Sequence, residues 1–273
     1  TLADLWNDTP IHFPQLEGAK RDGKDDDIKE LLGWVPSDYA RYSGPTIVYD
    51  AIRGSINIIA VKVLLKVGVN SVIKTAHEMG IKSYLKPIVS LPLGANEVSP
   101  LEMSVAFSPL ANGGYRIEPF AIRKIEDKKG NVLQQHIPIK HKVLDEQTFY
   151  VMDWMLKKVV RHGTGWRAKI KGYPIAGKTG TTNNFTDAWF MGFTPNYVTA
   201  VFLGNDDPSK SLGEKQAGGV VAAPIWKKAM EPILTKEVPV DFDLPEGIVF
   251  QTVDRDTGLL PGKYTKRKIR LPF

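Results

Sequence analysis

Residues 172–185 read GYPIAGKTGTTNNF, and this stretch constrains the fold most because it admits two incompatible architectures. Its first eight residues, Gly172 to Thr179, match G-x-x-x-x-G-K-[ST], the pattern of a phosphate-binding loop. Such a loop needs a buried strand before it and a helix that begins at its Lys-Thr. In the alternative, Lys178 to Thr181 form a strand at the edge of a sheet.

The neighbouring residues argue against the phosphate loop. The preceding segment, 167–172, is polar, and Pro174 removes a backbone N–H that the loop would need as a donor. Gly and β-branched Thr residues after Lys178 begin helices poorly and suit an edge strand. Proteins with such loops also have a second motif, an apolar strand followed by Asp, and the run 198–203 followed by Asp206 resembles it. Apolar strands followed by Asp are common, however, so this match adds little support. We therefore favour the edge strand.

The order of the remaining elements favours helices packed on an antiparallel sheet. Helical patterns dominate the first part, and two apolar runs joined by Thr194-Pro195-Asn196 then predict a hairpin. Because strands and helices do not alternate one by one, the predicted fold class is α+β. The predicted helices are 49–66, 71–79, 99–111, 145–160 and 222–230, and the predicted strands are 178–181, 188–193, 197–203 and two short ones within 115–143 around a turn at 128–131.

The last part of the chain differs in composition. Residues 237–273 are rich in Pro, with Asp and Gly turns. We predict a main domain at 1–235 and a small extended or β appendage at 236–273.

Composition excludes several kinds of site. The 273 residues contain no Cys, so disulfides, Cys-ligated zinc and a Cys nucleophile are ruled out. Five His residues show no metal-ligand spacing, so we expect no metal and no other cofactor. The net charge is +6, but no basic patch is interleaved with aromatic residues, and we expect no nucleic-acid partner.

A second polar element lies 123 residues before Lys178, where Ser55-Ile56-Asn57 interrupts an apolar helical pattern. One interpretation is a helix that tolerates two polar residues. The other is that both side chains line a cleft, where a hydroxyl can relay a proton and an amide can hold a substrate carbonyl and a lysine.

Lys-Thr-Gly accompanies S-x-x-K and a Ser/Asn element in penicillin-interacting serine enzymes. Together with other stretches, it makes the chain resemble the transpeptidase domain of class A (bifunctional) penicillin-binding proteins. The resemblance implies a fold like that of penicillin-binding proteins and serine β-lactamases. The stretches of this sequence that carry the resemblance are Trp34–Tyr39 with Gly44-Pro-Thr, Ala51–Asn57, Ser99–Met103 with Ala111–Gly114, Lys178–Thr182 with Asp187–Pro195, and Gly218-Gly219 with Ala223–Trp226.

The family's nucleophile is the Ser of S-x-x-K, which precedes the Ser/Asn element. The two S-x-x-K strings here, Ser71–Lys74 and Ser83–Lys86, follow Ser55 instead. We expect Ser71 to cap a helix and Ser83 to lie in a loop. Residues 2–5 and 8–11 resemble the segment after the nucleophile helix. We therefore expect the catalytic Ser and its Lys to lie outside this chain, which makes the domain incomplete at its N-terminus and inactive alone.

The resemblance implies D,D-transpeptidase activity, in which a Ser attacks a D-Ala–D-Ala peptide and an amine then takes the acyl group. Ser55 would relay a proton, Asn57 would hold the missing Lys and the substrate backbone, and Lys178 would supply positive charge near the substrate carboxylate. The Thr181 N–H would be one oxyanion donor. The residues expected to bind substrate are Thr179, Gly180, Thr181 and Thr182, with the hydroxyls of Thr179 and Thr181 on its carboxylate.

The implied partners are peptidoglycan stem peptides ending in D-Ala-D-Ala and β-lactam antibiotics. The resemblance also implies an extracytoplasmic location and a parent protein that is a glycosyltransferase, anchored in the membrane through an absent N-terminal segment. A D,D-carboxypeptidase or β-lactamase shares the three motifs, but the patterns around Trp34 and Ala223–Trp226 argue against both. A non-catalytic module that binds β-lactams or peptidoglycan is the remaining alternative.

Overall fold

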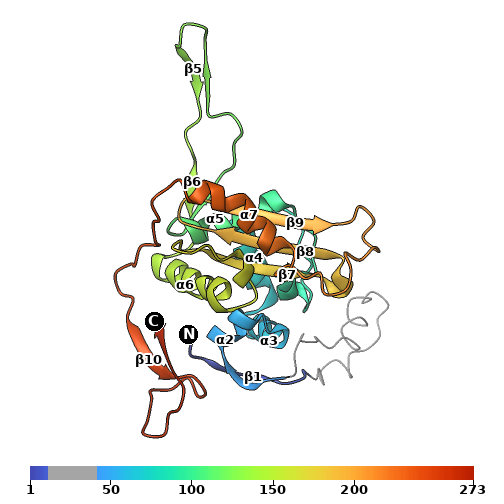
Figure 1. Cartoon of the computed structure of the whole chain (residues 1–273), viewed down its shortest axis with the longest axis vertical. Coiled ribbons are helices and arrows are strands. Elements are labelled where there is room, and N and C mark those ends of the chain that lie inside the picture. Colours follow the sequence, from blue (N-terminus) through green and yellow to red (C-terminus); the bar gives the residue numbers. More distant parts are fainter. Residues whose placement is uncertain (12–41) are drawn as a thin grey trace.

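The computed structural model describes residues 1–11 and 42–273, and its centre is a three-stranded antiparallel sheet (Figure 1). The strands are β7 (Ala176–Thr181), β8 (Asp187–Phe193) and β9 (Val198–Gly204), in the order β7-β8-β9. The predicted edge strand and the predicted hairpin are thus confirmed. Within the described residues β7 pairs only with β8, so its other edge carries no strand.

Helices cover both faces of this sheet, because successive side chains of β8 point to opposite sides. Phe193 packs edge-on against Phe107 of α5 (Pro100–Ala111), in a cluster that also holds much of α6 (Glu146–His162). Phe190 packs edge-on against Trp226 of α7 (Ala222–Leu234). In Figure 1 α7 crosses in front of the sheet and α5 lies behind it. The predicted α+β class is therefore confirmed.

Capping residues fix where two of these helices begin. The Ser99 hydroxyl accepts the Glu102 N–H at 3.2 Å, while the Glu102 carboxylate accepts the Ser99 N–H at 3.0 Å, which closes a capping box at α5. The Asp145 carboxylate accepts the Thr148 N–H at 2.6 Å at the start of α6. The helices predicted at 99–111 and 145–160 are confirmed.

The single helix predicted at 49–66 is wrong, because the chain breaks there into α2 (Val48–Gly54) and α3 (Asn57–Val67). Ser55 has φ 56° and ψ 49°, the left-handed conformation. Its N–H donates to the Ile52 carbonyl and the Ile56 N–H to the Ala51 carbonyl, so the two bonds close α2 as a Schellman motif. Such motifs usually place Gly at this position, since another residue costs roughly 1–2 kcal/mol there.

The expected helix cap at Ser71 is also wrong. Helix α4 spans Val69–Met79, and its N-cap is Gly68, so Ser71 lies inside the first turn. Ser83 does lie in a loop, as predicted, and its hydroxyl donates to the Glu102 carboxylate.

Two strand pairs flank the body near the two chain ends, which lie close together in Figure 1. β1 (Leu5–Asp8) pairs with β2 (Gly44–Ile47), and β10 (Phe250–Asp254) pairs with β11 (Lys268–Pro272). Leu271 joins the same buried cluster as α6. The division into 1–235 and 236–273 stays a prediction. The Trp34–Tyr39 motif lies outside the described residues.

A hairpin arm projects far from the body at the top of Figure 1. β3 (Tyr115–Ile117) and β6 (Lys140–Lys142) form its base, and β4 (Lys124–Glu126) and β5 (Val132–Gln135) form its outer part. The predicted turn at 128–131 joins β4 to β5, where the Asp127 carboxylate accepts two backbone N–H groups. The remaining elements are the short helices η2 (Leu91–Leu93), η3 (Trp166–Ala168) and η4 (Asn183–Phe185).

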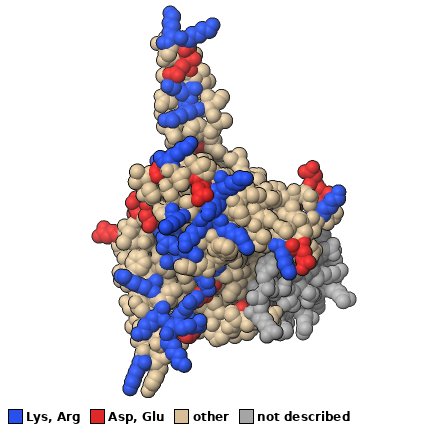
Figure 2. Space-filling view, in the orientation of Figure 1, with Lys and Arg blue, Asp and Glu red and all other residues tan. Residues whose placement is uncertain are grey.

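Lys and Arg side chains gather along the arm and over much of the visible face (Figure 2), in keeping with the net positive charge. Across residues 1–11 and 42–273, no helix has the length and apolar character needed to cross a bilayer. In the same ranges no group of three or more His, Asp or Glu could hold a metal ion.

Candidate active site

The structure brings together Lys178 of β7 and Ser55, the residue between α2 and α3. The Lys178 Nζ donates to the Ser55 Oγ at 2.7 Å and to the Thr179 carbonyl at 3.0 Å. In Figure 1 α2 and α3 lie beside β7, on the side away from β8. The contact therefore joins the free edge of the sheet to a helix junction held in a strained conformation, a combination that is common at functional sites.

Helix α2 is anchored on both sides, which fixes the position of Ser55. The Asp50 carboxylate accepts from the Arg255 Nε at 2.7 Å, at the end of β10. The Arg53 guanidinium donates to the His162 carbonyl at 2.8 Å, at the end of α6. A side chain on Gly163 would come within 2.4 Å of the Arg53 carbonyl, so α2 and α6 meet closely only because Gly stands there.

Among the described residues, the Lys178 ammonium donates hydrogen bonds to neutral acceptors only. Burial lowers its pKa to about 8, because taking an ammonium out of water disfavours the charged form. The group remains mostly protonated at pH 7, yet it can lose its proton within a unit or so of neutrality. Such a poised amine beside a hydroxyl is suited to stabilising an anion and to taking part in proton transfer.

Two threonine hydroxyls line β7 beyond Lys178. The Thr179 hydroxyl shares a hydrogen bond of 2.8 Å with the Thr164 hydroxyl, and the Thr181 hydroxyl accepts the Gly218 N–H at 3.0 Å. Since the Thr181 oxygen is already an acceptor, its own proton is free to be donated to a ligand. The strand thus offers an ammonium at Lys178 and, three residues further along, a hydroxyl donor at Thr181.

Three further predicted residues occupy different places. Asn57 is the first residue of α3 and is partly buried, two positions from Ser55. Gly180 lies opposite Trp189, whose Cβ would be only 3.1 Å from an added side chain. The Thr182 hydroxyl accepts the Asp187 N–H at 2.7 Å and bonds the Thr186 hydroxyl at 2.7 Å, so it closes the turn between β7 and β8. The roles predicted for all of these residues stay predictions.

The comparisons with known proteins identify the family of this chain. The family model described as "Penicillin binding protein transpeptidase domain" matches residues 17–231, well over half of the chain. The chain belongs to this family. The resemblance to class A penicillin-binding proteins is thereby confirmed.

Two curated members of the family are similar in sequence to most of this chain. Penicillin-binding protein 1A of Aquifex aeolicus is 41% identical over 226 residues, which cover 82% of this chain. Penicillin-binding protein 1A of Neisseria lactamica is 35% identical over 257 residues, or 91% of this chain. The match spans 31% of the length of each relative. The crystal structure of penicillin-binding protein 1A from Haemophilus influenzae has a TM-score of 0.85 and 29% identity, and covers 99% of this chain and 44% of that one.

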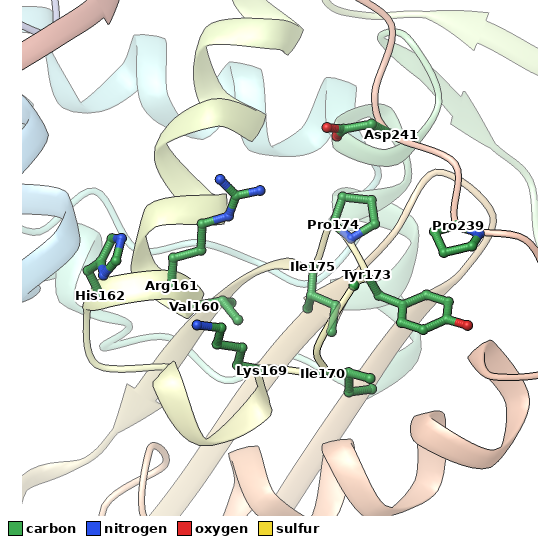
Figure 3. A pocket seen from close by; sticks show the side chains of 11 residues that line it. Val160, Arg161, His162, Lys169, Ile170, Tyr173, Pro174, Ile175, Pro239 and Asp241 are labelled. Atoms are coloured by element: carbon green, nitrogen blue, oxygen red, sulfur yellow. The ribbon is translucent and has the colours of Figure 1, made fainter.

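A hollow of about 570 Å³ lies before the start of β7 in this transpeptidase domain (Figure 3). Arg161, His162 and Lys169 line one side, and Tyr173 and Asp241 lie on other sides of it. Burial and the nearby positive charges of Lys158, Lys169, Arg161 and Arg53 lower the pKa of His162. None of the residues predicted for the active site lines this hollow.

Sequence reasoning did not assign Thr164, Gly218 or Gly219 to the site. A side chain on Gly218 would come within 2.3 Å of the Trp189 and Gly180 carbonyls, and one on Gly219 within 2.3 Å of the Thr164 carbonyl. Gly218 therefore allows its segment to lie directly on β7 and β8, and Gly219 allows it to approach the Thr164 backbone. The adjacent Gly-Gly pair was a signal for close backbone approach, but nothing near it in sequence indicated the strand that it touches.

Proposed function

We propose that this chain is the crosslinking part of a bifunctional peptidoglycan synthase and joins stem peptides by serine acyl transfer. The observation that carries the proposal is the 2.7 Å contact between Lys178 and Ser55 at the free edge of β7. Membership in the transpeptidase family supports the same reaction class. The parent protein would also carry a glycosyltransferase and a membrane anchor, and this domain would lie outside the cytoplasm.

The free edge of β7 would receive the D-Ala-D-Ala end of a stem peptide as an added strand. The Lys178 ammonium and the hydroxyls of Thr179 and Thr181 would bind the terminal carboxylate, and the Thr181 N–H would donate to the oxyanion. Gly180 and Thr182 would contribute backbone groups to the same edge. β-Lactams would occupy this position as substrate mimics.

The reaction breaks one C–N bond and forms one ester bond. In the acylation step a serine oxygen attacks the peptide carbonyl and its proton passes through the amine of its Lys to the Ser55 oxygen, while the departing D-Ala nitrogen takes a proton from Ser55. Because Lys178 donates to the Ser55 oxygen, the Ser55 proton points elsewhere and can pass to that nitrogen. Asn57 would hold the amine of the nucleophile's Lys and the substrate backbone. The amine of a second stem peptide then attacks the ester and restores the serine.

The nucleophile in this proposal comes from outside residues 1–273. Ser83 donates its hydroxyl to the Glu102 carboxylate, and Lys74 pairs with Glu78 at 3.6 Å on an exposed face of α4. Ser71 is likewise exposed on α4. None of these groups forms a hydrogen bond or ion pair with Ser55 or Lys178 among the described residues.

Labelling with a fluorescent penicillin tests the proposal. We expect the full-length parent to be labelled on a Ser outside residues 1–273, and a chain of residues 1–273 to stay unlabelled. Labelling of Ser71 or Ser83 would overturn the assignment of the nucleophile. A folded parent that takes no label would instead favour a non-catalytic binding module, and release of D-Ala without crosslinks in the presence of an acceptor amine would favour a carboxypeptidase.

A further inference from the structure

The outer arm carries apolar side chains that the protein does not bury. Ile137 is 79% exposed, Leu133 67% and Ile122 64%, and several neighbours are more than two-fifths exposed. Two strands alone are only marginally stable in water, and a soluble protein seldom displays so much apolar surface on one projection without a use for it. The arm is therefore a candidate contact surface.

Its strands also have unpaired edges. β4 and β5 pair only with each other among the described residues, so each presents one outer row of backbone N–H and C=O groups. The register shifts between Ile125 and Glu126, which leaves Leu133 without a residue opposite it. Unpaired strand edges readily accept an added strand, and apolar side chains on either face then contact alternate side chains of the ligand.

The arm carries a net positive charge, which favours an acidic ligand. Residues 118–142 contain six Lys or Arg and three Asp or Glu. The three acidic groups are engaged locally: Glu126 pairs with Lys124, Asp127 holds the turn, and Glu118 contacts His141. Arg123, Lys128 and Lys129 form no ion pair with any described residue, so they remain available to an acidic ligand.

The base of the arm is held firmly to the body. The Val143 and Leu144 N–H groups both donate to the Gly114 carbonyl, and the Ile117 N–H donates to the Ser108 hydroxyl of α5. Gly114 has φ 92°, and an added side chain there would come within 2.3 Å of the Leu144 carbonyl. A ligand bound to the outer part of the arm would therefore be attached to the body through a base that is fixed on α5.

We propose that the β4–β5 arm docks an extended segment of a partner protein, both acidic and apolar, which adds as a third strand. A lipid bilayer fits the arm less well. Hydrocarbon would leave the strand edges unpaired, which costs several kcal/mol per group, whereas strand addition pairs them. The apolar side chains are also interleaved with charged ones along the arm rather than gathered at one end. This inference is independent of the acyl-transfer proposal.

The test places a photoreactive benzoylphenylalanine at Leu133 of the full-length parent in its own cells. Tyr264, 86% exposed on the opposite part of the molecule, is the matched control position. We expect Leu133 to crosslink one protein through a peptide that is acidic and apolar, at least tenfold above the control. Combining Lys128→Glu with Lys129→Glu should lower that yield about tenfold, while penicillin labelling stays unchanged.

A synthetic peptide with the crosslinked sequence provides the second measurement. It should slow hydrogen exchange at backbone amides of β4 or β5 in the parent, and a Pro in its centre should abolish the effect by removing a strand donor. Crosslinks only to lipid, to a second copy or to the parent's own residues would overturn the proposal. So would a yield no greater than at Tyr264, or one that charge reversal leaves unchanged.

Discussion

Lys178 of β7 and Lys157 of α6 both have ammonium groups withdrawn from water, and their surroundings differ. Lys157 lies 3.3 Å from the Asp153 carboxylate and 3.0 Å from the Asp241 carboxylate, so α6 is tied to the segment before Phe242. Lys178 bonds to a hydroxyl and a carbonyl instead. A paired charge holds two parts of a chain together, whereas one with neutral partners is available to a substrate anion.

The pKa shifts express the same difference. Burial raises the pKa of Asp153 to about 7, even though the charge of Lys157 opposes this shift. Burial lowers the pKa of Lys178 to about 8, and no acidic group among residues 1–11 and 42–273 opposes this shift. The charge of Lys157 thus partly offsets the desolvation of Asp153, whereas the desolvation of Lys178 is not offset by any described acidic group.

Removing Lys157 should have the largest effect. Lys157→Met leaves Asp153 buried without its cation, and breaking a buried pair in this way typically costs about 3–5 kcal/mol. We expect a loss of this size at pH 8 in the free energy of unfolding, measured by denaturant titration. Lys158→Met is the matched control, because Lys158 stacks on Trp154 and forms no ion pair with a residue that the structure describes; its loss should cost only about 0.5–1 kcal/mol.

The pH dependence of Asp153 sharpens that prediction. Its folded pKa of about 7 exceeds the ordinary value near 3.8, so the folded state holds a proton that the unfolded state has lost between those values. Stability from this group is present below about pH 4 and disappears as the pH rises through about 7. The cost of Lys157→Met should therefore shrink at pH 5, where Asp153 is neutral; an equal cost at both pH values would contradict the assignment.

Removing Lys178 should cost activity and not stability. Lys178→Met in the full-length parent takes away a charge that stabilises the anion, and we expect acylation by penicillin to slow about 10²–10³-fold. The free energy of unfolding should stay the same or rise, because a desolvated ammonium is replaced by an apolar side chain. If Lys178→Met unfolded the protein while Lys157→Met stopped acylation, the comparison between the two lysines would be reversed.

Much of the Lys178 region was predictable; around Lys157 the helix was predictable, but the ion pairs were not. Lys-Thr-Gly-Thr after a Pro indicated an edge strand, and Ser99 with Glu102 indicated a helix start, because both signals are local. The bond between Lys157 and Asp241 joins residues 84 positions apart, and no local pattern records it.

Ser55 marks the limit of local reasoning within the site itself. Its position was identified from its polarity in an apolar run, but the pattern predicted one helix where the structure has two. The left-handed position of Ser55 carries no Gly that would have marked the break, and the contacts that anchor α2, to Arg255 and to the end of α6, are distant in sequence. At Ser71 a local signal was misleading. A hydroxyl at the start of a helical pattern predicted a helix cap, but the N-cap of α4 is Gly68.

The pH profile of acylation should show a smaller effect. With a pKa of about 8, Lys178 loses its charge above that pH, so the acylation rate of the parent should fall about tenfold for each further pH unit. The rate is measured with a penicillin that is stable over the range. Lys157→Met should keep the same descending limb. A rate that rises through pH 8 would mean that Lys178 acts in its neutral form as a base.

The smallest effect concerns the threonine hydroxyls that follow Lys178 along β7, which are neutral, unlike the carboxylates that pair with Lys157. Thr181→Val removes the acceptor of the Gly218 N–H and a proposed ligand of the substrate carboxylate, so we expect about 1 kcal/mol less stability and roughly tenfold slower acylation. Thr182→Val is the matched control, because its hydroxyl holds the Asp187 N–H in a turn. It should lower stability by a similar amount and leave acylation nearly unchanged. Equal slowing in both variants would instead make Thr182 a substrate ligand, as the sequence first predicted.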